Sequence, residues 1–204
     1  IELMDSKESV PSTSQPIEGT SGKWSTRNKR LQKKKISMAY LLKIICSSQE
    51  SCIDWLRNKS LIPKIMFCPN CNKKMEFEVQ ETSIDNYIWI CKECKIDPPS
   101  YSTRHGSWLE EINAPLADIL LFVYLWVNGF NEIQIAKETN LPMETVRNWD
   151  KTYTDMCASR LEDEDGDDDY NSKTSSKDAS IIAWRKKNKF KDPFLEFLKD
   201  ADSL

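Results

Sequence analysis

The sequence predicts an α+β fold, in which a small cysteine-rich β unit precedes a unit of three helices and charged tails flank both. Two close cysteine pairs bracket segments that have strand composition. The stretch that follows has the apolar spacing of helices, with capping residues where helices would begin. Both ends of the chain are polar and charged, so only the middle two-thirds is expected to build a core.

Charge is sorted along the 204-residue chain, although the totals of 29 basic and 32 acidic side chains nearly balance. Residues 1–66 carry 12 basic and 6 acidic side chains, 67–160 carry 9 and 14, and 161–204 carry 8 and 12. The net charge of −3 gives no global sign of a nucleic-acid binder. The longest apolar run, Ile119–Val127, is far shorter than the ~20 residues that span a bilayer, so we expect a soluble protein without a membrane partner.

Residues 1–36 are expected to form a disordered arm, because much of this segment is rich in Ser, Thr, Pro and Gly and poor in apolar side chains. Its second half is basic, with no acidic residue between Gly22 and Ser37. Clustered cations favour phosphate contact or nuclear import, although a merely solvated basic tail has the same composition. The candidate phosphate contacts are Lys29, Arg30, Lys33, Lys34 and Lys35.

Residues 37–64 are predicted to form one or two helices, and Pro63 closes the segment. Apolar side chains recur there at helical spacing. The residues expected to pack into a core are Tyr40, Ile44, Ile45, Ile53 and Leu56.

Residues 65–104 are predicted to form a zinc ribbon. Two Cys-x2-Cys pairs lie 19 residues apart, which is the spacing of a four-cysteine zinc site, and they comprise Cys68, Cys71, Cys91 and Cys94. Between them, residues 75–80 alternate apolar and polar side chains and residues 87–90 have strand composition. Four thiolates leave no open position on one tetrahedral Zn²⁺, so the site should be structural, whereas a redox Cys-x-x-Cys would not need two pairs. The nearby His105 is expected to be a surface residue rather than a ligand.

Residues 105–160 are predicted to form a trihelical helix-turn-helix domain. Residues 114–127 are apolar on nearly every face, which indicates a buried helix. Asn131 has the capping-box spacing to Gln134 and opens a short helix that ends near Asn140, after which the chain restarts as a third helix. In this third helix one face is apolar and consists of Val146, Trp149, Tyr153 and Cys157.

The opposite face of the third helix carries side chains suited to DNA, although Glu144 and Asp155 lie on the same face and would repel phosphates. Arg147 can pair with guanine and Asn148 with adenine, while Thr145 and Lys151 are placed to reach phosphates. A structural three-helix core with a merely solvated polar face remains the alternative, because helix-turn-helix geometry is common in helical domains.

Residues 161–204 are expected to form an acidic, mostly disordered tail. Glu162–Asp169 holds seven acidic side chains in eight residues, which repel one another and disfavour folding. A merely solvated acidic spacer is the simplest interpretation of this block. The short amphipathic stretch Pro193–Leu198 suggests a docking peptide, so a protein partner at the acidic or C-terminal part of the tail is the alternative.

The order of these parts resembles the N-terminal half of Merlin-type transposases and their bacterial insertion-sequence relatives, over roughly residues 48–160. The matching features are Trp55-Leu56 to Leu61-Ile62, the four-cysteine ribbon, Ser102–Trp108, and Val146–Trp149 with Cys157 beyond. The resemblance implies a module that recognises the terminal inverted repeats of a mobile element. The family's RNase-H-like catalytic domain has no counterpart in the 44 residues after Arg160, so we expect no enzyme activity.

Together these observations favour a transposase-derived, zinc-dependent, sequence-specific reader of double-stranded DNA in the nucleus. It would act in transcription, chromatin or repression of related elements, and it would take no small-molecule substrate. Two alternatives remain open. One is a protein-interaction adaptor, which the mildly acidic segment 67–160 supports. The other is a truncated piece of an active transposase, which a first residue other than Met keeps open.

Overall fold

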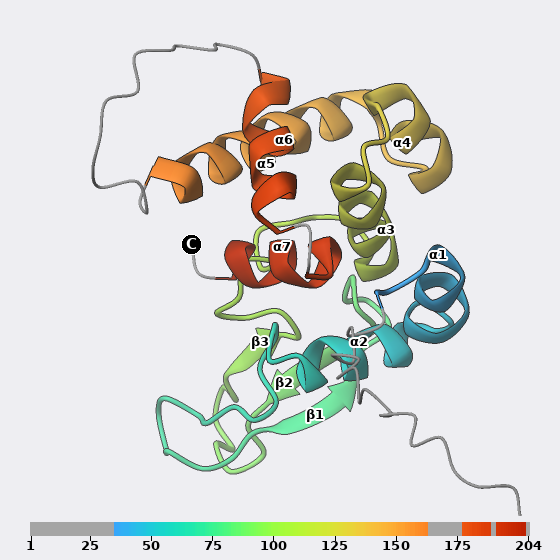
Figure 1. The fold of residues 1–204 in the computed structure, drawn as a ribbon. Helices are drawn as coiled ribbons and strands as arrows, with labels where there is room; N and C mark the ends of the chain where they lie inside the picture. The colour runs from blue at the N-terminus through green and yellow to red at the C-terminus, as the bar shows by residue number, and fades with distance from the viewer. Residues whose placement is uncertain (1–34, 163–176, 189–190, 203–204) are drawn as a thin grey trace, which may run out of the picture. The chain divides into compact units, whose positions relative to one another are not determined.

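The computed structural model describes residues 35–162, 177–188 and 191–202, and this part of the chain is α+β (Figure 1). Its elements, in chain order, are α1 (Met38–Tyr40), the π-helix η1 (Leu41–Ile45), α2 (Gln49–Asn58), β1 (Glu76–Val79), β2 (Tyr87–Ile90), β3 (Ser100–Ser102), α3 (Leu116–Val127), α4 (Glu132–Thr139), α5 (Met143–Glu162), α6 (Lys177–Lys187) and α7 (Pro193–Ala201). The predicted α+β class is confirmed. None of the described helices has the length and apolar character needed to cross a membrane.

The first helices bury a different face from the one that the sequence predicts. Ile45, Ile53 and Leu56 are buried as expected, and Leu41 joins them. Tyr40 is 47% exposed and Ile44 is 55% exposed. The expectation that these two residues pack into the core is wrong. Leu41 and Ile45 share the i, i+4 spacing of Tyr40 and Ile44, so the pattern alone does not say which pair faces inward.

The sheet is antiparallel, in the order β1-β2-β3, and it contains both strands that the sequence predicts. Phe77 pairs with Trp89, and Trp89 pairs with Tyr101 on its other side. These three aromatic side chains therefore form a row across one face of the sheet. Trp89 is buried together with Met75 in a small core beside the cysteines. A sheet of this size buries little apolar surface, so it needs additional stabilisation.

The three predicted helices of the middle segment are present. α3 is the buried helix expected from its composition, with Phe122 and Leu125 both fully buried. Asn131 caps α4 through a complete capping box with Gln134, and Asn140 ends that helix in the left-handed conformation. α4 contacts both α3 and α5, so the three helices share one core.

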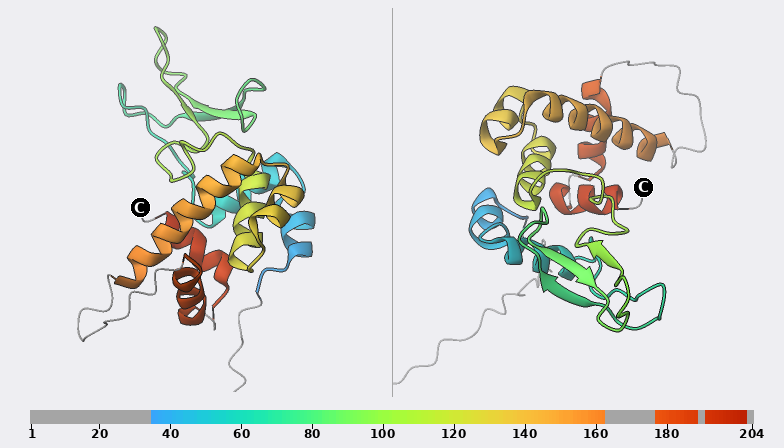
Figure 2. Two further views of the ribbon diagram at one scale, coloured as in Figure 1. Left: turned by 90° about the horizontal axis from the view of Figure 1, so that it is seen from above. Right: turned by 180° about the vertical axis from the view of Figure 1, so that it is seen from behind.

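The C-terminal helices belong to the core, which corrects the expectation of a mostly disordered tail at 161–204. α6 packs against α5 and α7 packs against α3 (Figure 2). Trp184 of α6 is 1% exposed, and its indole N–H donates to the Asp200 carboxylate at 2.9 Å. In α7 the buried residues Phe194, Phe197, Leu198 and Ala201 follow helical spacing. Most of the acidic block Glu162–Asp169 lies outside the described residues.

Local chemistry explains why α7 forms. Asp192 caps the helix by accepting hydrogen bonds from the backbone N–H groups of Phe194 and Leu195, and Pro193 occupies the first turn, where its missing donor costs little. The same Asp192 carboxylate accepts a hydrogen bond from the backbone N–H of Ile36. The amphipathic stretch that the sequence marks as a docking peptide thus docks on its own chain.

Truncating an α7 side chain tests this packing. We expect Leu198→Ala to lower the free energy of unfolding by about 3 kcal/mol, because it removes a fully buried side chain and leaves a cavity. Ile133→Ala is the matched control, since Ile133 is 69% exposed and its loss should change the free energy by less than about 0.5 kcal/mol. Equal values from denaturant titration of the two variants would show that α7 does not belong to the core.

Candidate functional site

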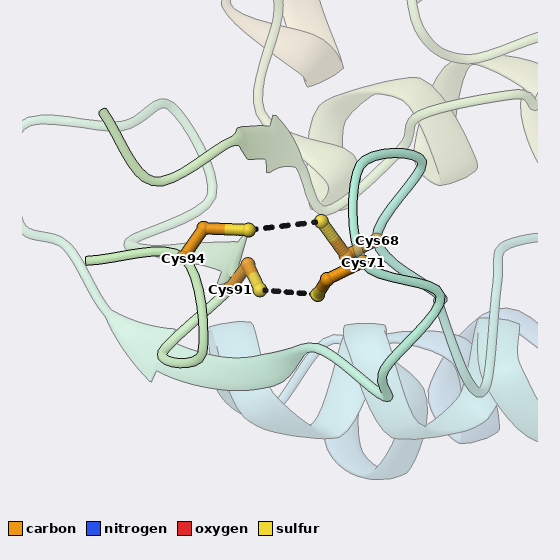
Figure 3. A group of neighbouring side chains, drawn as sticks. All are labelled: Cys68, Cys71, Cys91 and Cys94. Atoms are coloured by element: carbon orange, nitrogen blue, oxygen red, sulfur yellow. Dashed lines mark hydrogen bonds between the residues drawn. The ribbon is translucent and has the colours of Figure 1, made fainter. Parts of the chain in front are cut away.

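The four predicted metal ligands come together in the structure. The sulfur atoms of Cys68, Cys71, Cys91 and Cys94 all lie within 4.8 Å of one another (Figure 3). Cys68 Sγ is 3.8 Å from Cys94 Sγ, and Cys71 Sγ is 3.5 Å from Cys91 Sγ. These separations are too long for disulfides, which join sulfurs at about 2.0 Å. They match a tetrahedron of sulfurs around a metal at about 2.3 Å, whose edges are about 3.8 Å. The cluster can therefore hold a metal ion.

Two turns position these sulfurs. In the first, the Asn72 N–H donates to the Cys68 carbonyl and the Cys68 N–H donates to the Lys73 carbonyl, each at 2.8 Å. Asn72 has a φ of +55°, a conformation that asparagine adopts more readily than most residues. In the second, Cys91 directly follows β2 and donates its N–H to the Pro99 carbonyl at 3.0 Å. Cys68 and Cys91 are buried, whereas Cys71 and Cys94 are half-buried at the edge of the cluster.

The thiols of the cluster differ in acidity. Burial raises the pKa of Cys68, but hydrogen bonds from the backbone N–H groups of Cys71 and Asn70, together with those from the thiols of Cys91 and Cys71, outweigh burial and lower that pKa to about 7. Burial, followed by the neighbouring thiols, raises the pKa of Cys94 to about 12. A metal must displace protons from such thiols, so its affinity falls as the pH falls.

His105 lies outside the cluster, in line with the expectation that it is not a ligand. Its Nδ1 is 2.6 Å from the Glu110 carboxylate, and its ring stacks on Tyr101 at a centroid distance of 4.3 Å. The other carboxylate oxygen of Glu110 accepts from the Gly106 N–H at 2.6 Å. Bonds to Gly106 and His105 hold the pKa of Glu110 below its usual range. These contacts stabilise the turn that follows β3.

The predicted DNA-contacting residues of α5 gather on one side of that helix. Arg147, Asn148 and Lys151 are exposed, and Thr145 is half-buried at the edge of the same surface. The apolar side is also as predicted, with Val146 and Cys157 completely buried and Tyr153 5% exposed. Burial raises the pKa of Cys157 to about 12, so this thiol is a packing group rather than a nucleophile. We call the surface formed by Thr145, Arg147, Asn148 and Lys151 the α5 polar face.

One member of the α5 polar face is already paired within the protein. Arg147 Nε donates to the Glu132 carboxylate of α4 at 3.3 Å, and both side chains are solvent-exposed. An exposed ion pair of this kind contributes about 0–1 kcal/mol. A phosphate or a guanine can therefore displace Glu132 at little cost.

Only one of the five predicted phosphate-contacting residues of the basic arm falls within the described part of the chain. Lys29, Arg30, Lys33 and Lys34 lie outside the described residues. Lys35 is described, and it is exposed.

The sequence does not predict the buried ion pair that Arg104 and Asp85 form beside the sheet. Arg104 and Asp85 are each about 1% exposed, and two guanidinium nitrogens of Arg104 donate to the two carboxylate oxygens of Asp85 at 2.7 and 2.6 Å. Arg104 also donates to the carbonyls of Ile112 and Ala114, at 2.7 and 2.8 Å. Gln49 donates to Asp85 at 3.1 Å. This network ties the sheet to α2 and to the segment that leads into α3.

The sequence analysis also does not single out a second group of cations, which lies between residues 55 and 75. Residues 55–75 hold five basic and no acidic side chains, namely Arg57, Lys59, Lys64, Lys73 and Lys74. This excess of positive charge is visible in the sequence. It does not stand out in the charge totals of residues 1–66 and 67–160, because the boundary between these segments divides the group.

Comparisons with known proteins find no relative of this chain. Neither a protein-family model, nor a curated protein, nor a solved structure matches the chain. The described features that bear on function are the cysteine cluster, the α5 polar face and the distribution of charge.

Proposed function

We propose that the protein is a non-catalytic, zinc-dependent reader of double-stranded DNA, in which a zinc ribbon precedes a helix-turn-helix domain. The observation that carries this proposal is the sorting of side chains on α5, whose α5 polar face is exposed over a buried apolar face. α4 packs on α5, and only three residues separate the two helices. This is the arrangement in which a helix-turn-helix presents its recognition helix to the major groove.

Zinc is the ion that best suits the cysteine cluster. A donor set of four thiolates is typical of structural zinc, because sulfur ligands prefer softer ions to Mg²⁺ or Ca²⁺. Four protein ligands leave no position for water or substrate, so the ion would stabilise the three-stranded sheet rather than catalyse a reaction.

The resemblance to Merlin-type transposases extends the proposal. A chain that retains the recognition module of such an enzyme would bind the ends of a related element. It would then act in the nucleus on transcription, on chromatin or on repression of the element. The α5 polar face supports this reading, because Arg147 and Asn148 have the side chains that most often read guanine and adenine.

Selection from a random duplex pool tests this function. We expect the full zinc-loaded chain to enrich a defined site, and Arg147→Ala combined with Asn148→Ala to remove the preference, at a cost of about 1–3 kcal/mol for each lost base contact. Thr152→Ala combined with Asp155→Ala alters exposed residues further along α5 and should keep the preference.

The outcomes separate the candidate functions. Unchanged enrichment by the Arg147 and Asn148 variant would refute the role of the α5 polar face. Retention of DNA by the wild-type chain without enrichment, or no retention at all, would favour the protein-interaction adaptor, which the acidic balance of residues 67–160 supports.

A further inference from the structure

A basic groove lies where α2 passes the sheet. It has a volume of about 500 Å³, and Arg57, Lys64, Lys74, Met75, Glu76, Phe77 and Trp89 line it. Three of these seven residues are cationic and one is acidic. We call this site the ribbon groove. It is formed by α2, by β1 and β2, and by the loop that carries the first cysteine pair.

Arg57 is held in the ribbon groove by aromatic rings rather than by a carboxylate. Its guanidinium carbon lies 3.7 Å from the ring centre of Phe77 and 4.9 Å from that of Trp89. Its Nε and one of its terminal nitrogens are buried without a hydrogen-bond partner in the described part of the chain. Burial lowers the pKa of Arg57, and nearby Asp54 only partly offsets this. The site therefore holds a positive charge in place without neutralising it.

The two lysines add to this charge. Lys64 follows Pro63 at one end of the loop, and Lys74 lies at the other end, where the bridge between Phe67 and Lys74 closes the first cysteine turn. Within the described residues, neither lysine forms an ion pair. A stacked arginine beside two lysines that form no ion pair is suited to an oxyanion.

We infer that the ribbon groove binds phosphates of the DNA backbone through Arg57, Lys64 and Lys74. This inference rests on the proposed function, and it adds a second contact surface that is independent of sequence. Backbone phosphates suit the groove because its lining holds three cations and one carboxylate, a balance that attracts anions. Such contacts position a duplex and strengthen its binding without selecting bases.

Salt-dependent binding of a random-sequence duplex to the full zinc-loaded chain tests the inference. We expect Arg57→Gln, Lys64→Gln and Lys74→Gln together to reduce the slope of log affinity against log salt by about 1 for each cation. At 0.1 M salt, each lost contact should weaken binding about tenfold. The control variant neutralises Lys43, Lys92 and Lys95, which are exposed lysines outside the groove, and should change binding much less.

Two further variants protect the test against misfolding. Lys64→Gln with Lys74→Gln leaves the stacked Arg57 in place and should give about two-thirds of the loss in slope. Arg57→Lys keeps the charge but removes the planar fork, so it should weaken binding less than Arg57→Gln. Metal content and the thermal transition are measured for every variant, and the comparison uses those that match the wild-type chain.

The results distinguish this inference from the function it rests on. If the groove variants and the control variant bind equally while the wild-type chain binds strongly, the groove inference is overturned and the DNA-binding proposal stands. If the wild-type chain binds no duplex, both are overturned. A polyglutamate peptide is tested in parallel, and loss of peptide binding with unchanged duplex binding would assign the groove to an acidic protein instead.

Discussion

Cys91→Ser should abolish metal binding and unfold the sheet. The cysteine is completely buried, and it directly follows β2, so its loss removes one of the four ligands and the link between a strand and the ion. Structural zinc in comparable small sites contributes about 10–16 kcal/mol, and a three-stranded sheet with a small core has little to replace it. We expect near-complete loss of bound metal and of the thermal transition of the sheet.

The control for this variant is Cys46→Ser, which removes a half-buried free thiol outside the cluster. It should retain its full metal content. If Cys91→Ser also retained full metal content with an unchanged transition, the four-cysteine site would be disproved. Acidification provides a second check, since metal should leave the wild-type chain as the pH falls and protons compete for the sulfurs.

Arg104→Met should lower the free energy of unfolding by about 3–5 kcal/mol, because it leaves the buried Asp85 carboxylate without its cation. The carbonyls of Ile112 and Ala114 lose their donors at the same time. For a domain of this size, the midpoint of thermal unfolding should fall by roughly 10 °C.

The matched control makes the same substitution in an exposed pair. Arg147→Met breaks the ion pair with Glu132, which should cost no more than about 1 kcal/mol. Asp85→Asn in the Arg104→Met background should recover part of the loss, because a neutral amide costs less to bury than a carboxylate. Equal stability of the Arg104→Met and Arg147→Met variants would refute a structural role for the buried pair.

The sequence predicts the features that depend on neighbouring residues. The strands between the cysteine pairs, the capping box at Asn131 and the two faces of α5 all appear as expected. Each depends on a local cause: alternation within a strand, a cap and its partner three residues on, or the periodicity of one helix. The cysteine cluster joins two distant turns, but its characteristic spacing makes it predictable.

The sequence does not predict features that depend on contacts between residues far apart in the chain. α7 looks like a short amphipathic end, and only its packing against α3, more than 60 residues earlier, shows it to be core. At the other end, η1 contains hydrogen bonds from residue i to i+5, such as that between the Cys46 N–H and the Leu41 carbonyl. A periodicity of 3.6 does not describe such a segment, which helps to explain why Tyr40 and Ile44 are misassigned.

The buried pair of Arg104 and Asp85 is missed for a related reason. Charged side chains are almost never fully buried unless they are paired, so composition assigns both to the surface. Their sequence separation of 19 residues gives no hint that they meet. The ribbon groove is likewise built from α2 and from strands that follow about 20 or more residues later.

The position of α7 in the core also sets the order in which the protein can fold during synthesis. The sheet and its four cysteines lie between residues 67 and 102, and their contacts are local in the chain. Phe197, which is completely buried and packs against Trp126 and Tyr153, is made about a hundred residues after Cys94. At roughly 5–20 residues per second, the ribosome supplies it some 5–20 s later. The cysteine site can thus bind a metal ion before α7 has been synthesised, so metal binding does not have to wait for the helical core to close.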